Sequence, residues 1–133
     1  MTTTTPTERD LERCLDLAAG PTGLESLART YFWQGEFLSL PSLLPETTVR
    51  DLVDDVSRVR QEAVRRGVPG YKTSSSVAWP VLRRAAPAVS SLFRSRALLR
   101  FLEGVTDARL EPAPDWDPHA CAVYHYDRAG DGV

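Results

Sequence analysis

The chain has 133 residues, 42% of them hydrophobic and 26% charged, which is enough to bury the core of one globular domain. Its net charge of −2 argues against a general binder of nucleic acid or of anionic membranes. No apolar stretch approaches the length of a membrane span, and the Thr-rich start lacks the features of a signal peptide. The two cysteines, Cys14 and Cys121, form no disulfide framework, so we expect a cytoplasmic protein.

The N-terminal half has the periodicity of amphipathic helices. We expect a disordered tail over residues 1–6 and a single domain over residues 7–133. Hydrophobic spacing and capping residues predict helices over 7–20, 23–33 and 45–67. Between the last two, "GEFLSL" is typical of a short strand.

The second half changes from helices to strands. "YKTSSSVAWP" is typical of an edge strand or an irregular segment. The pattern from Ala88 to Gly104 predicts two helical pieces, the second of which Ser95 can cap. A Pro-punctuated stretch then becomes strand-like toward Tyr126. Helices first and strands last predict an α+β fold. We expect Trp33, Trp79 and Trp116 to be packing residues, because no basic groove accompanies them.

Near the end of the chain, His125-Tyr126-Asp127 spells His-x-Asp, the spacing with which many non-haem iron sites begin. On a strand these two side chains would share a face. Iron in such a site needs a third ligand, and the other histidine, His119, lies ~20 Å away along the same strand. The chain cannot complete the site, so His125 and Asp127 remain only an alternative metal pair.

Two further interpretations of these residues stay open. His119 and Cys121, with His125, are a possible zinc set, although their spacing matches no standard zinc module and a fourth ligand is missing. Alternatively, they are ordinary strand residues: a small buried cysteine and two partly exposed histidines. Because a His-x-Asp match often arises by chance, the residues alone favour the ordinary interpretation.

Three segments in order suggest a family. "GEFLSLPSLLPETTVRDLVDDV" pairs a strand with a Leu-Pro-Glu helix entry, "SSLFRSRALLRFLEGVTDARLEP" follows as helices, and "AVYHYDRAGDGV" is a strand and turn. Together they resemble the N-terminal portion of Fe(II)/2-oxoglutarate-dependent oxygenases of the prolyl-hydroxylase, phytanoyl-hydroxylase and DNA-dealkylase type, over about residues 35–133. The resemblance implies an N-terminal helical support plus the first strands of a double-stranded β-helix, a jelly roll that is incomplete in this chain.

The resemblance changes which face of the last strand matters. In the family, the strand before the iron motif often offers a polar pair to the cosubstrate, which implies that Tyr124 and Tyr126 contact 2-oxoglutarate. Alanines and tyrosines form the more apolar face of this strand, so we expect that face to point into the barrel. His125 and Asp127 would then point outward, and the family's iron motif would follow Val133.

A whole member of the family would bind Fe(II) and 2-oxoglutarate and hydroxylate a small-molecule or amino-acid-like substrate. Because the iron triad is incomplete here, we expect this chain alone to bind neither group and to have no oxygenase activity. The alternative is a non-catalytic helical interaction module, or a split subunit that a partner chain completes. An unfinished sheet exposes an edge through which it can pair with another strand or self-associate. Neither nucleic acid nor a membrane is an expected partner.

Overall fold

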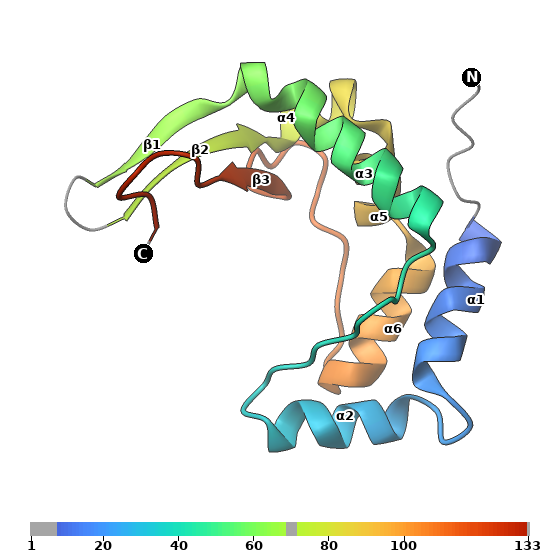
Figure 1. Cartoon of the computed structure of the whole chain (residues 1–133). Helices are drawn as coiled ribbons and strands as arrows, with labels where there is room; N and C mark the ends of the chain where they lie inside the picture. The colour runs from blue at the N-terminus through green and yellow to red at the C-terminus, as the bar shows by residue number, and fades with distance from the viewer. Residues whose placement is uncertain (1–7, 69–71, 133) are drawn as a thin grey trace. The chain divides into compact units, whose positions relative to one another are not determined.

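The structure is a computed structural model that describes residues 8–68 and 72–132. The expected tail over residues 1–6 lies outside these ranges. The elements in chain order are α1 (Glu8–Ala19), α2 (Leu24–Trp33), α3 (Glu46–Val59), the 3-10 helix η1 (Arg60–Glu62), β1 (Val64–Val68), β2 (Lys72–Ala78), α4 (Trp79–Ala85), α5 (Pro87–Phe93), α6 (Arg96–Thr106) and β3 (Ala122–His125) (Figure 1). This content confirms the α+β class. Among the described helices, none combines the length and the apolar character needed to cross a membrane.

The chain divides into two compact units, and it passes between them within α3, within α5 and after Pro112. The helical unit comprises the described residues up to Arg50 together with Ser91–Pro112. The sheet unit comprises Asp51–Ser90 and the described residues from Ala113 onward. Each unit has buried apolar residues of its own.

The helical unit is held together by apolar stripes on α1, α2 and α6. Its buried cluster consists of Leu11, Leu15, Ala97, Phe101 and Val105. Within each helix these residues recur at helical spacing, so each helix presents one apolar stripe to the others. Ser95 caps α6 as predicted, since its Oγ accepts a hydrogen bond from the Leu98 amide at 3.1 Å. The predicted stop at Gly104 is wrong: α6 continues to Thr106, and Gly104 instead gives Leu24 of α2 room to pack.

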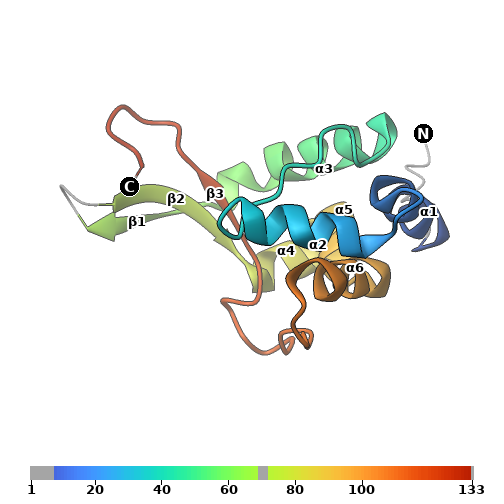
Figure 2. The ribbon, with the colours of Figure 1, turned by 90° about the horizontal axis from the view of Figure 1, so that it is seen from below.

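The sheet unit contains one antiparallel sheet of three strands, in which β2 lies between β1 and β3 (Figures 1 and 2). Its register pairs Ser75 with Arg65 and His125, and Ser76 with Val64 and Tyr124. Directly paired residues lie on the same face of a sheet, and faces alternate along each strand. The register therefore sorts every strand residue onto one of two faces.

We call these the covered face and the open face. Val77 of the covered face is 1% exposed and belongs to the core of the sheet unit. The other members of the covered face are Arg65, Gly67, Thr73, Ser75, Val123 and His125. The open face carries Val64, Arg66, Val68, Lys72, Ser74, Ser76, Ala78, Ala122 and Tyr124, and Tyr126 continues it just past the end of β3.

Several predicted elements are wrong, for identifiable reasons. Residues 35–40 form no strand, because Gly35 and Glu36 adopt positive φ angles of 74° and 64°, which break an extended chain. The helix predicted to reach residue 67 ends as η1 at Glu62, because pairing of Val64–Val68 with β2 overrides the local helical pattern. The expected edge strand at residues 71–80 contains β2, which is central. Strands β1 and β2 also precede α4, so the order is not helices first and strands last.

Candidate functional site

The open face of the sheet has a floor of small hydroxyl side chains between two rows of large ones. Ser74 and Ser76 of β2 are only 4% and 8% exposed. In register, Ser76 lies between Val64 of β1 and Tyr124 of β3, and Ser74 lies opposite Arg66. Because strands are spaced about 4.8 Å apart, the two flanking rows stand roughly 10 Å from each other across the serines. We call this arrangement the serine trough.

The tyrosines of the trough stand side by side. The ring centroids of Tyr124 and Tyr126 are 6.5 Å apart, and the ring planes differ by 24°. That separation is close to the spacing of about 6.6 Å between residues i and i+2 of a strand. The two residues are 55% and 53% exposed. Both rings therefore present a face and a hydroxyl group to an incoming ligand.

The expected burial of this face is wrong for the chain as described. Tyr124 and Tyr126 are more than half exposed, whereas Val77 on the opposite face is 1% exposed. The prediction compared the two faces of the last strand alone. Position in the sheet accounts for the difference, because β3 is an edge strand whereas Val77 lies on the central strand β2. Composition does not decide which face is covered, because the open face carries more apolar residues than the covered face.

Asp131 fixes the turn that follows β3 to the covered face. Its side chain is 1% exposed and accepts a hydrogen bond from Nη1 of Arg65 at 2.8 Å and from Oγ1 of Thr73 at 3.2 Å. Asp131 Oδ2 also accepts the amides of Asp127 and Arg128, each at 3.1 Å. The hydrogen bond from Arg65 is the main reason that the pKa of Asp131 is well below its usual range. The carboxylate therefore stays ionised and holds the turn.

The two residues of the alternative metal pair, His125 and Asp127, have different surroundings in the structure. Asp127 accepts a hydrogen bond from Nη2 of Arg60 at 2.5 Å, and this bond lowers its pKa. His125 lies on the covered face, and its Nε2 is buried without a hydrogen-bond partner in the described part of the chain. No group of three His, Cys, Asp or Glu side chains that could hold a metal occurs among residues 8–68 and 72–132.

The residues of the possible zinc set do not all lie on one strand. Strand β3 begins at Ala122, so His119 and Cys121 precede it and only His125 of the set belongs to it. His119 is exposed, and its backbone amide donates to Asp117 at 2.8 Å. Burial raises the pKa of the Cys121 thiol, which favours the protonated form rather than the thiolate that binds metal.

Arg66 is the functional candidate that the sequence did not reveal. It lies on the open face opposite Ser74, and in the described ranges it forms no ion pair or hydrogen bond through its side chain. Its chain neighbour Arg65 points to the other face and binds Asp131. The alternation in Val-Arg-Arg-Gly-Val places Arg66 on the same face as Val64 and Val68, but this follows only once the segment is known to be a strand.

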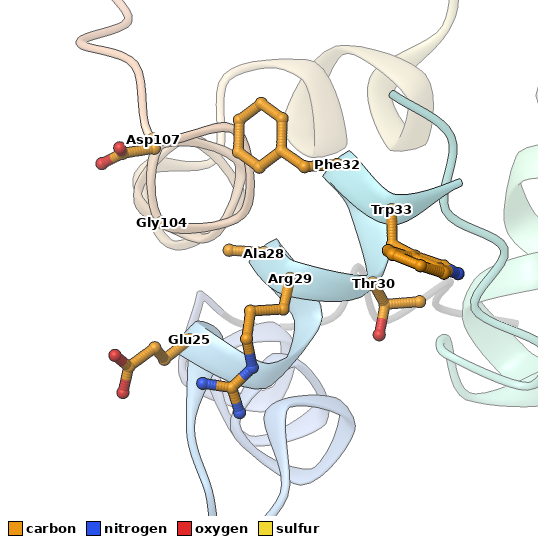
Figure 3. Close-up of a pocket in the computed structure, with 8 residues that line it drawn as sticks. All are labelled: Glu25, Ala28, Arg29, Thr30, Phe32, Trp33, Gly104 and Asp107. Carbon is orange, nitrogen blue, oxygen red and sulfur yellow. The ribbon is translucent and has the colours of Figure 1, made fainter. Parts of the chain in front are cut away.

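A second hollow lies within the helical unit, between α2 and the C-terminal end of α6 (Figure 3). Its volume is about 1010 Å³, and its lining consists of Glu25, Ala28, Arg29, Thr30, Phe32, Trp33, Gly104 and Asp107. Phe32 reaches toward α6, whereas Trp33, which is 90% exposed, points to the other side of α2 (Figure 3). The charged side chains of both signs that line it are exposed, so the hollow lacks the buried polar groups that orient a ligand.

No protein-family model matches the chain, and neither the curated proteins nor the solved structures contain a significant match to it. The site is therefore interpreted from its own geometry.

Proposed function

We propose that the chain is the N-terminal portion of an Fe(II)/2-oxoglutarate-dependent dioxygenase, a hydroxylase of a small-molecule or amino-acid-like substrate. On this proposal the sheet is the beginning of a jelly roll. The observation that carries the proposal is the serine trough: Tyr124 and Tyr126 stand exposed and side by side along the strand that precedes the fixed turn. Phenol hydroxyl groups donate well to a carboxylate, so this pair suits 2-oxoglutarate.

Exposed apolar side chains on the open face favour a further layer of structure over it. Val64 and Val68 are 52% and 61% exposed on the same face as the tyrosines. A further layer of strands over this face would bury these side chains, as in a sheet-on-sheet fold. The fixed turn supports the same interpretation, because Thr73 and Gly132 exchange backbone hydrogen bonds of 3.2 Å and 3.1 Å. The chain after β3 thus returns to the sheet beside β2.

On the proposal, His125 and Asp127 are not the metal ligands. Asp127 is held by Arg60, and His125 lies on the face opposite the tyrosines. No catalytic step is therefore assigned to either residue. On the proposal, the role of this chain is to contact and orient 2-oxoglutarate through Tyr124 and Tyr126, and the metal ligands belong to sequence after Val133.

Two experiments test the proposal. The coding sequence past the codon for Val133 should continue in frame and encode a His-x-Asp motif shortly afterwards. The extended protein should then form succinate from 2-oxoglutarate when Fe(II) is added, whereas the 133-residue chain should form none. A stop codon at that position, with no neighbouring gene that encodes the remainder, would contradict the proposal. Clear succinate formation by the 133-residue chain would contradict the prediction that its iron site is incomplete.

A split subunit is the second candidate function. Every residue of β1, Val64–Val68, is exposed, and β1 is an edge strand of the sheet. An exposed edge offers free backbone groups for pairing with a partner strand. Size-exclusion chromatography with light scattering checks this function. A monomer that remains monomeric when the products of neighbouring genes are added argues against it.

A further inference from the structure

The two faces of the sheet differ in how their charged side chains are paired. On the covered face, Arg65 is neutralised by Asp131, which is itself almost fully buried. On the open face, the cations are Arg66 and Lys72, and the three strands contain no Asp or Glu at all. Neither cation forms an ion pair with another described residue. The open face is therefore positive and the nearby acids are turned away from it.

The apolar groups of the open face are arranged around this positive charge. Val64, Arg66 and Val68 alternate along β1, so the guanidinium stem lies between two exposed valines. Across the serines, the rings of Tyr124 and Tyr126 form the opposite wall of the trough. The tyrosine rings therefore stand roughly 10 Å from the β1 row that contains Arg66, and the serine hydroxyl groups lie between them.

We propose that the serine trough binds a small organic anion with a flat apolar body. Arg66 holds its carboxylate or phosphate group, the rings of Tyr124 and Tyr126 contact its body, and the hydroxyl groups of Ser74 and Ser76 line the floor. Arginine suits this task because its planar, always-charged group binds carboxylate and phosphate through paired hydrogen bonds. This anion site does not rest on the proposed function: 2-oxoglutarate would contact the same two tyrosines, so the two ligands would compete for them.

The test is an NMR titration of the 133-residue chain with phenyl phosphate, followed through the backbone amides. The largest shifts should lie at Ser74, Ser76, Tyr124 and Tyr126. Benzyl alcohol has the same ring without the charge and should bind more weakly. Inorganic phosphate has the charge without the ring and should also bind more weakly. Higher ionic strength should weaken the binding of phenyl phosphate, because the contact with Arg66 is exposed to solvent.

The variant Arg66→Gln should weaken phenyl phosphate binding about five-fold, as expected for one exposed ionic contact. The matched control is Arg50→Gln, since Arg50 is an exposed arginine of α3 whose ion pair among the described residues is with Glu46 of the same helix. This control should leave the affinity unchanged. Because the Arg66 side chain forms no ion pair or hydrogen bond with another residue that the structure describes, unaltered amide spectra of the free variant will show that its fold is intact.

Three results would overturn the inference: equal affinity of the Arg66→Gln variant, equal affinity of benzyl alcohol or inorganic phosphate, or shifts confined to the hollow between α2 and α6. Its failure is distinguishable from failure of the proposed function. If phenyl phosphate binds as expected but the extended protein forms no succinate, the anion site stands and the oxygenase proposal fails. The opposite outcome would leave the oxygenase proposal and remove this anion site.

Discussion

Arg65 and Arg66 are neighbours in the chain, yet they belong to regions with different roles. Arg65 lies on the covered face, where it holds a buried carboxylate and the turn after β3. Arg66 lies on the open face, where no acidic residue of the strands accompanies it. The alternation of faces along a strand separates a structural cation from a ligand-binding one. The comparison shows that one face stabilises the sheet unit and the other remains available for function.

The largest expected difference between the faces is in packing. Val77→Ala on the covered face should lower the free energy of unfolding by about 2 kcal/mol, because a fully buried valine loses two methyl groups. Val68→Ala on the open face is the matched control, and it should change stability by less than about 0.5 kcal/mol because Val68 is 61% exposed. Urea unfolding measures both. Equal losses would remove the distinction between the faces.

Asp131→Asn should produce a smaller loss of stability that depends on pH. Hydrogen bonds lower the pKa of Asp131 in the folded chain below 3.8, so its carboxylate stabilises the fold above that pH. That contribution disappears as the pH falls toward the lower pKa of the folded state. The difference in unfolding free energy between the native chain and the variant should therefore be constant near neutrality and shrink below about pH 3.8.

The control for this titration is Asp54→Asn, which removes an exposed carboxylate of α3. Its effect on the free energy of unfolding at neutral pH should be small, because the side chain is exposed. A constant difference for Asp131→Asn down to the lowest pH measured would show that the carboxylate does not hold the turn through its charge.

The smallest expected change in stability is that of Arg66→Gln, which is compared with Arg65→Gln. Arg65→Gln should destabilise the sheet unit and remove most of the pH dependence that Asp131 contributes, because the two side chains bind each other. Arg66→Gln should change the free energy of unfolding by less than about 0.5 kcal/mol. Thermal unfolding of the two variants at neutral pH compares them directly. If Arg66→Gln destabilises as much as Arg65→Gln, Arg66 has a structural partner and is not free for a ligand.

The helices were predictable because their signals are local. The stripe that contains Leu11 and Leu15, and the cap at Ser95, follow from spacing and from one side chain. Local patterns also indicated β3 and a possible strand at β2, but β1 and the order of the strands were not predictable, because they depend on partners far along the chain. Val64–Val68 continues a helical pattern and becomes β1 only when it pairs with β2. Similarly, Tyr124 and Tyr126 are recognisable as a pair, but their exposure depends on the place of β3 at the edge of the sheet.

The tryptophans also show how far burial can be predicted from the sequence. All three are expected to pack, but only Trp79 is buried, whereas Trp33 and Trp116 are 90% and 81% exposed. Residue type alone does not place a side chain inside. Asp131 is a further example: a carboxylate in a glycine-rich turn suggests solvent exposure, yet Arg65, sixty-six residues away, brings it to 1% exposure.

The most direct test of the central claim, that the tyrosine face is open and binds the ligand, is nitration of tyrosine read out by mass spectrometry. Tyr124 and Tyr126 should be modified rapidly in the free chain and Tyr31, which packs against the helical core, slowly. Saturating phenyl phosphate should protect the first two and leave Tyr31 unchanged. Slow modification of Tyr124 and Tyr126 in the free chain, or no protection by the ligand, would contradict the account.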